Sequence, residues 1–273
     1  MSFLKFKFSF FIILFLLEIG LFFLAPHNLQ AADPINYSIK IDQFSPSFKK
    51  EKKTLFLVSS EDENFLIKNN SFQKIVKTLS LSSKSLLVKT GEINPKHNPP
   101  SKDLIANTPF LNLDDPQIKK TALSLKRKKN PIPQVEKFVY KHIDKKINGI
   151  PFVSAKNIIR NKSGDCTEHT VLTIALLRRL KIPARAILGL IYAPQFKKNK
   201  NVFVFHMWAE AYYKKKWHLV DATRPGKKKI NHYLALTEHN LKSSMPLNYL
   251  KMMASLKNLK IKYLKNFPKI KNN

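Results

Sequence analysis

The sequence predicts an α+β protein in which a buried helix packs against an antiparallel pair of strands. Residues 167–180 form an almost unbroken apolar run without Gly or Pro, which is typical of a mostly buried helix. Residues 201–223 (NVFVFHMWAEAYYKKKWHLVDAT) alternate in polarity on both sides of a polar turn near 213–216, which predicts two paired strands. Short β-favouring runs predict three more strands nearer the N-terminus, at 37–41, 54–59 and 85–89.

The chain is strongly basic. Lys and Arg number 49 against 18 Asp and Glu, giving a formal net charge of +31, and only six of the 49 are arginine. Arginine makes the bidentate contacts with bases and phosphates that nucleic-acid readers use, so this lysine excess does not predict specific nucleic-acid binding. It predicts a solvated lysine-rich surface or a weak attraction to an anionic envelope surface. A hydrophobic content of 44% excludes wholesale disorder.

Residues 1–31 are predicted to be a signal peptide. Two lysines precede an apolar run at 8–24, and Ala31 offers a small residue at a cleavage position. Glu18 interrupts the apolar run and makes a permanent membrane span less favourable, although an uncleaved anchor stays the alternative. Both interpretations export residues 33–273, to the periplasm or outside the cell.

The mature chain divides into three predicted parts. Residues 32–104 are a β-rich accessory region that ends in a linker-like stretch, NPKHNPPSK. Residues 105–265 hold the helices and strands with chemical interest, and 266–273 form a basic tail. Three helices are expected before the long apolar helix, one starting at Asp114 and two more at 133–147 and 154–160.

The only cysteine of the chain, Cys166, lies at the start of the apolar helix. Asp165 suits the N-cap position, and Glu168 three residues later completes a capping box, so Cys166 is the first helical residue. The helix dipole and the unpaired N–H groups there stabilise a thiolate and can bind a developing oxyanion. Gly164 lets another chain segment approach closely. Taken alone, Cys166 could equally be a small apolar residue that opens a buried helix.

The two predicted strands bring a histidine and an acid to the same sheet face. If Tyr212 faces Trp217 across the turn, His206 is opposite Thr223 and Asp221 is its diagonal neighbour. A helix-start cysteine, a strand histidine and an acid on the adjacent strand are the three parts of an activated thiol nucleophile.

Two stretches, SGDCTEHTVLTIALLRRLKIPARAILGLIY (163–192) and FHMWAEAYYKKKWHLVDAT (205–223), resemble the transglutaminase-like superfamily. Weaker similarity continues through HYLALTEHNL and LKNLKIKYL, so the resemblance covers about residues 105–265. It implies a papain-like fold, with a Cys-bearing helix packed on an antiparallel sheet that carries His and Asp. It also implies that Cys166 is the nucleophile, that His206 is the base and later the acid, and that Asp221 orients the imidazole.

The predicted function is therefore an exported cysteine-dependent acyl-transfer enzyme acting on peptide or carboxamide bonds through a thioester. Water resolves the thioester in a protease or amidase, whereas an amine resolves it in a transglutaminase, and the sequence leaves both open. The expected partner is a protein or peptide substrate, and no cofactor or metal is expected. The alternative from another class is a non-catalytic cationic protein that binds the cell envelope on the same fold.

Four neighbouring features have structural interpretations. His169 is expected to support the helix, because one Cys and one His are too few ligands for zinc. His218 is expected at the surface or in packing, and Trp208 either flanks the site or belongs to the core. Residues 227–229, three lysines, predict a solvated turn. The sequence does not identify a second oxyanion donor.

Overall fold

The computed structural model describes residues 38–62, 65, 67–80, 84–94, 99–126, 130–147, 152–242 and 256–266. Residues 34–273 form one compact unit, and every described element belongs to it. The predicted signal peptide and nearly all of the basic tail lie outside the described residues, so both stay predictions. Among the described residues, no helix is both long enough and apolar enough to cross a membrane.

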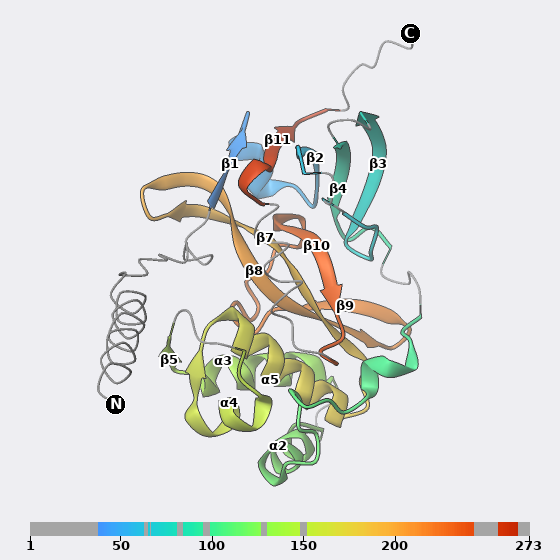
Figure 1. Cartoon of the computed structure of the whole chain (residues 1–273), viewed down its shortest axis with the longest axis vertical. Coiled ribbons are helices and arrows are strands. Elements are labelled where there is room, and N and C mark those ends of the chain that lie inside the picture. The colour runs from blue at the N-terminus through green and yellow to red at the C-terminus, as the bar shows by residue number, and fades with distance from the viewer. Residues whose placement is uncertain are drawn as a thin grey trace, which may run out of the picture. The chain divides into compact units, whose positions relative to one another are not determined.

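Helices and strands alternate in the middle of the chain, between two groups made mainly of strands (Figure 1). The α-helices are α2 (Pro116–Lys126), α3 (Pro131–His142), α4 (Ala155–Asn161) and α5 (Cys166–Arg179). The strands are β1 (Ser38–Asp42), β2 (Lys53–Ser59), β3 (Gln73–Ser80), β4 (Ser85–Gly91), β5 (Lys145–Lys146), β6 (Ser163–Gly164), β7 (Ala184–Phe196), β8 (Asn199–Tyr213), β9 (Lys216–Val220), β10 (Tyr233–His239) and β11 (Lys260–Leu264). Short 3-10 turns are η2 (Pro46–Lys50), η3 (Lys102–Ile105), η4 (Ile230–His232) and η5 (Leu256–Asn258).

Within the described ranges, nine strands share one sheet, in the order β10-β7-β8-β1-β11-β2-β4-β3, with β9 paired to β8 outside this path. Neighbours are antiparallel except for β1 and β11, which run parallel. The strands predicted at 37–41, 54–59 and 85–89 are confirmed as β1, β2 and β4. Through β1 and β11 the predicted accessory region shares its sheet with the helix-bearing part of the chain. The exact domain boundaries at 104 and 265 stay predictions.

Two elements differ from the sequence prediction. β3 was not predicted, because it is an edge strand with mostly exposed side chains and therefore lacks an apolar alternation. The helix predicted at 133–147 is α3, which begins two residues earlier and ends five residues earlier. Asn130 caps its start by accepting from Ile132 N at 3.2 Å, and Pro131 is tolerated in the first turn. After the C-cap Ile143 the chain leaves the helix, and the N–H groups of Asp144 and Lys145 both donate to Lys162 O.

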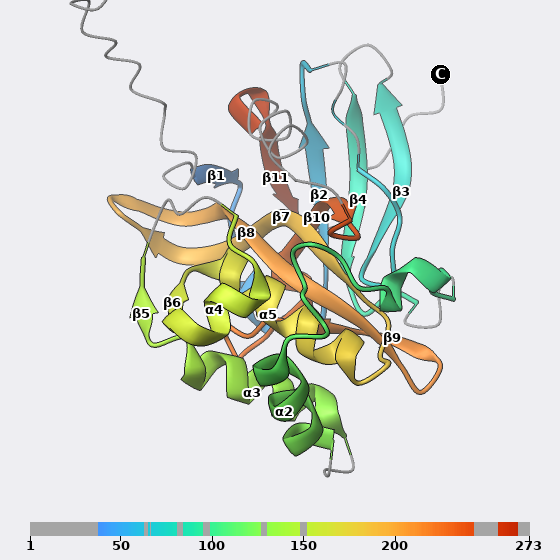
Figure 2. The same cartoon turned by 60° about the horizontal axis from the view of Figure 1, so that its bottom comes forward.

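The four α-helices of the described residues group on one side of β7 and β8, with α5 nearest the sheet (Figures 1 and 2). Every residue of α5 from Thr170 to Arg178 is buried, as its apolar run predicts. The other face of the same strands has its own apolar cluster, which includes Trp208, Trp217 and Tyr233. The strands β7 and β8 are therefore covered on both faces, and α5 is fixed against a rigid layer.

Arg178 near the end of α5 is a buried cation whose hydrogen-bond acceptors, within the part of the chain that the structure describes, are backbone carbonyls. Its side chain is fully buried, and burial lowers the pKa of its guanidinium to about 10. The guanidinium donates to four backbone carbonyls, with Nε and Nη2 sharing Ala184 O at 3.0 and 2.8 Å. The other acceptors are the carbonyls of Asp103, Ala106 and Asn240. Arg178 thus ties η3, the start of β7 and the end of β10 to one helix.

Replacing Arg178 with Met should lower the free energy of unfolding by about 3 kcal/mol, because several buried carbonyls lose a charged donor. Urea denaturation followed by circular dichroism measures this change. The matched control is Arg160→Met, since Arg160 is half exposed and pairs with Asp115 at 2.6 Å. That change should cost no more than about 1 kcal/mol. Equal losses in the two variants would contradict the structural role of Arg178.

Candidate active site

The N-terminus of α5 is held by a complete capping box, as the sequence predicts. Asp165 Oδ1 accepts from Thr167 N at 2.9 Å, and Glu168 Oε2 accepts from Asp165 N at 2.9 Å. Cys166 is the first helical residue and is partly buried against the main apolar core. The thiol is therefore presented at the positive end of a 14-residue helix.

Gly164 has two close neighbours. Another chain segment approaches it, as predicted, since Lys146 of β5 pairs with it, and the capping side chain of Glu168 packs against it as well. A Cβ atom at position 164 would lie 2.3 Å from Glu168 Cβ. Any larger residue would therefore displace the cap that fixes the first turn of α5.

Glu168 is itself almost fully buried, with 1% of its surface exposed. Burial raises the pKa of this carboxyl to about 7, against the opposing effect of the N–H of Asp165. Its Oε2 serves the cap, which agrees with the predicted role as a capping residue rather than a second acid. The Glu168 carboxyl therefore holds the backbone N–H of Asp165, the residue before Cys166.

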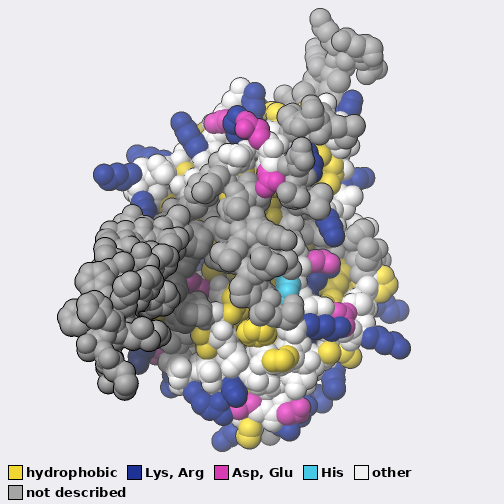
Figure 3. Space-filling view, viewed as in Figure 1, with side chains coloured by type: hydrophobic (Ala, Val, Ile, Leu, Met, Phe, Trp, Pro, Cys, Tyr) yellow, Lys and Arg dark blue, Asp and Glu magenta, His cyan; other side chains and the backbone are white. Residues whose placement is uncertain are grey.

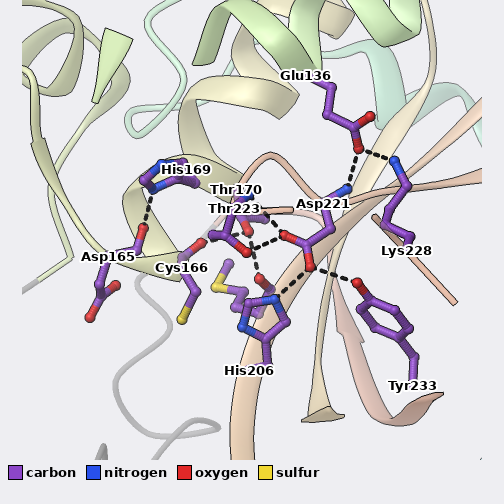
Figure 4. Close-up of polar contacts among 11 residues, drawn as sticks. Glu136, Asp165, Cys166, His169, Thr170, His206, Asp221, Thr223, Lys228 and Tyr233 are labelled. Atoms are coloured by element: carbon purple, nitrogen blue, oxygen red, sulfur yellow. Dashed lines mark hydrogen bonds and ion pairs between the residues drawn. The ribbon is translucent and has the colours of Figure 1, made fainter. Parts of the chain in front are cut away.

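His206 of β8 and Asp221, just after β9, lie in direct contact (Figure 4). His206 Nε2 is 2.8 Å from Asp221 Oδ2, and the two residues are 7% and 1% exposed. A carboxylate only accepts, so Nε2 carries the hydrogen of this bond. Figure 4 also places the Cys166 side chain beside the imidazole, on the side away from Asp221.

The register between β8 and β9 is the predicted one, since Tyr212 pairs with Trp217. The ladder ends at Ala209 and Val220, so the expected pairing of His206 with Thr223 does not form. The chain turns after Val220, and Thr223 instead donates to Asp221 Oδ1 from its N–H at 3.0 Å and from Oγ1 at 2.6 Å. The turn that shortens β9 thereby supplies two donors to the carboxylate.

Asp221 is a buried carboxylate surrounded by donors. Besides His206 and Thr223, Tyr233 at the start of β10 donates its hydroxyl to Oδ2 at 2.8 Å. Burial acts to raise the pKa of Asp221, but the charge of His206 and these hydrogen bonds outweigh it and hold the pKa below its usual value. Asp221 is therefore an anion over the physiological pH range.

The pKa of His206 is raised, although burial acts in the opposite direction. The charge of Asp221 and the hydrogen bond to it have the larger combined effect, and interactions with the Cys166 side chain add to it. The imidazole is therefore held as an imidazolium next to a thiol.

Three residues of the site were missed by the sequence reasoning. Tyr233 is one, and Glu136 of α3 is another, because Glu136 Oε1 accepts from Asp221 N at 2.8 Å. The third is Lys228, whose ammonium pairs with the same Glu136 oxygen. The prediction of a solvated turn at 227–229 is wrong for Lys228, which is mostly buried by this ion pair. The sequence contained a signal for Glu136. This acid lies four residues after Ile132 and three before Val139, so it occupies the apolar face of α3, where an unpaired charge is rare.

The loops and strands around these residues are joined by further hydrogen bonds. Thr170 Oγ1 donates to Cys166 O at 2.8 Å and to Met207 O at 3.0 Å, so one hydroxyl links the helix of Cys166 to the strand of His206. His169 Nδ1 lies 2.6 Å from Asp165 O and supports the first turn of α5, as predicted.

The remaining candidate side chains take structural positions. His218 Nε2 lies 3.1 Å from Tyr213 O, so it packs at the end of its hairpin. Trp208 is buried beside His206, with its ring 5.1 Å from that of Tyr233 in an edge-to-face contact. No group of three or more metal-ligating side chains occurs among the residues that the structure describes.

Comparison with known protein families gives one match, and it covers the residues of the candidate site. The family model for the transglutaminase-like superfamily matches residues 120–222, a span that includes Cys166, His206 and Asp221. No protein with a curated description matches the chain.

Similar solved structures share low sequence identity with the chain. A candidate cysteine protease from Cytophaga hutchinsonii is 18% identical, over 77% of this chain and 83% of its own, with a TM-score of 0.46. The periplasmic domain of TgpA from Pseudomonas aeruginosa is 13% identical, over 76% of this chain and 90% of its own, with a TM-score of 0.46. Red sea bream transglutaminase is 10% identical, over 71% of this chain and 51% of its own, with a TM-score of 0.33.

The family match and the site geometry concern the same residues. The matched span holds the Cys-bearing helix α5 and the antiparallel strands β8 and β9. His206 lies on β8, and Asp221, which contacts it, directly follows β9. The predicted resemblance to the transglutaminase-like superfamily is confirmed for residues 120–222, the span that the family model matches.

Proposed function

We propose that this protein is an exported cysteine-dependent acyl-transfer enzyme that acts on peptide or carboxamide bonds, with Cys166 as nucleophile. The observation that carries the proposal is the position of the His206 imidazole between the Asp221 carboxylate and the Cys166 thiol. An imidazolium beside a helix-start cysteine favours the thiolate, which is the reactive form. The family match supports the proposal that the chain is a cysteine-dependent enzyme.

In the first half of the reaction, the Cys166 thiolate attacks the carbonyl carbon of the substrate and a carbon–sulfur bond forms. The carbonyl electrons move to oxygen, and the N–H of Cys166 at the helix start is proposed to bind this oxyanion. The oxyanion collapses, the carbon–nitrogen bond breaks, and the leaving amine takes its proton from the His206 imidazolium. The products are a free amine, a neutral imidazole and a thioester on Cys166.

In the second half, neutral His206 takes a proton from the incoming nucleophile as that nucleophile attacks the thioester. Water gives a carboxylic acid and restores the thiolate and the imidazolium. An amine gives a new amide by the same proton transfers. We propose hydrolysis as the main outcome, with transamidation as the outcome when an amine reaches the thioester first.

Asp221 and its neighbours are proposed to position the imidazole rather than to contact the substrate. The hydroxyls of Thr223 and Tyr233 hold the carboxylate in one orientation, and Glu136 holds its backbone N–H. With the carboxylate fixed, the second imidazole nitrogen is directed toward Cys166.

Removing the imidazolium should slow the alkylation of Cys166 at low pH. An ordinary thiol, with a pKa of about 8.5, is less than about 1% ionised at pH 6. Iodoacetamide should therefore label the native protein at pH 6 at least about tenfold faster than the His206→Ala variant, with the difference shrinking toward pH 9. His206 stays protonated at pH values below its raised pKa, so the faster labelling persists there. It is lost as the pH rises through that pKa.

Two controls accompany this measurement. Cys166→Ala should take no label, because it lacks the only thiol. His218→Ala should keep the native rate, because His218 binds a backbone carbonyl in its hairpin. Equal rates for native protein and His206→Ala at pH 6 would contradict the proposed ion pair.

Weakening the support of Asp221 should lower turnover in graded steps once a substrate is in hand. Tyr233→Phe removes one hydrogen bond and keeps the ring, so kcat should fall by about two- to tenfold. Asp221→Asn should cost about 10²- to 10⁴-fold, and Cys166→Ala should abolish turnover. The control is Tyr263→Phe, whose hydroxyl binds Glu51 and Ser47 away from the site. If Tyr263→Phe lowered kcat as much as Tyr233→Phe does, a specific role for Tyr233 would be excluded.

Export is proposed from the N-terminal residues alone. Mass spectrometry of protein recovered from fractionated cells should find a mature N-terminus near Ala32 in the periplasmic or extracellular fraction. An intact N-terminus in the membrane fraction would establish the uncleaved anchor instead.

A further inference from the structure

A groove lined with lysines lies beside η4, in the part of the chain that follows Asp221. We call it the lysine groove, and its volume is about 580 Å³. Its lining residues are Lys50, Glu51, Lys52, Lys53, Glu92, Lys229, Ile230 and Asn231. The volume is in the range of ligand-binding clefts.

The floor of the lysine groove is rigid. Asn231 is buried and donates to Thr54 Oγ1 at 2.9 Å, while its carbonyl accepts from Thr90 Oγ1 at 2.9 Å. Glu51, one of the two acids of the lining, accepts from Tyr263 OH at 2.5 Å and Thr54 Oγ1 at 3.2 Å. Its carboxylate is therefore partly satisfied within the fold and opposes the lysines less than a free acid would.

The local potential around the groove is positive. His232, the residue after Asn231, stacks on Phe48 with ring centroids 4.7 Å apart. Burial lowers the pKa of His232 to about 4, and the charges of Lys229, Arg224 and Lys49 add to the effect. The lining itself carries four lysines against two glutamates, so its formal charge is positive.

The lysine groove is close to the candidate site along the chain. Arg224 N donates to Asp221 O at 3.1 Å, at the start of the loop that leads to Lys229. Tyr233, which binds Asp221, follows the groove residue Asn231 by two positions, a separation of at most about 7 Å between their backbones. The wall of the groove and one support of the Asp221 carboxylate are therefore formed by neighbouring residues of one chain segment.

We propose that the lysine groove binds an acidic segment of a peptide or protein substrate, an inference that rests on the proposed function of the site. Lysine ammonium groups are point charges on flexible stems, which suits carboxylates held at varied angles. A concave groove with Ile230 in its wall fits a chain segment better than the flat surface of a bilayer. The groove has four lysines and no arginine in its lining, which disfavours the bidentate recognition of phosphates.

The test must separate the groove from the general charge of the protein, because Lys and Arg side chains are spread over the described face in Figure 3. One variant replaces three exposed groove lysines with Gln, at Lys50, Lys52 and Lys53. The matched control replaces three exposed lysines elsewhere, at Lys120, Lys198 and Lys200, with the same change in net charge. The ligand is a fluorescein-labelled peptide rich in Glu, and binding is followed by anisotropy at low and high salt.

The groove variant should bind the peptide at least about tenfold more weakly than the native protein at low salt, and the control should stay within about twofold. Equal weakening in both variants would overturn the proposal, since binding would then follow net charge alone. Two further arms use a single-stranded oligonucleotide and vesicles of phosphatidylserine and phosphatidylcholine. Tighter binding of either one with the same three-lysine dependence would also overturn it.

Iodoacetamide labelling of Cys166 separates this inference from the proposed function. All three proteins should be labelled at the same rate at pH 6, because the substituted lysines are not part of the site. If the native protein bound the peptide at the groove but resisted labelling, the proposed function would be contradicted and the proposed peptide binding would stand. A native protein that is labelled quickly but shows no groove-dependent peptide binding would contradict only the groove.

Discussion

The burial of the Asp221 carboxylate is the constraint on which the rest of the site depends. A charge that is 1% exposed is costly unless every lone pair finds a donor. Those donors come from separate parts of the chain, from β8 through His206, from β10 through Tyr233 and from the turn through Thr223. One side chain therefore fixes the relative positions of two strands and a turn.

The same constraint extends into the helical layer. Glu136 of α3 holds the backbone of Asp221, and burial raises its pKa against the opposing effect of Lys228. Lys228, Glu136, Asp221 and His206 form a row in which two cations flank two anions. Two anions this close are tolerable in a buried site because a cation contacts each of them. Thr170 then connects the row to the helix of Cys166.

Local features of the site were predictable from the sequence, whereas its long-range support was not. The capping box around Cys166 depends on residues within four positions of one another, and the register of Tyr212 with Trp217 follows from a short hairpin. Tyr233 and Glu136 reach Asp221 from 12 and 85 positions away, so only the tertiary fold brings them together. The edge strand β3 escaped prediction for a different reason, since an exposed strand has no burial pattern to read.

The hairpin between β8 and β9 limits where residues can be inserted or deleted in the segment that leads to Asp221. Its two-residue turn places Lys214 and Lys215 at φ of 52° and 60°, the conformation that right-twisted strands require and that Asn and Gly adopt most easily. Evolution can vary the length and composition of this turn as long as the pairing that follows keeps its register. A single residue gained or lost within β9 would instead rotate Asp221 to the opposite face of the sheet, away from His206. Lineages that keep the chemistry should therefore accumulate length changes in the turn and almost none in the five residues that follow it.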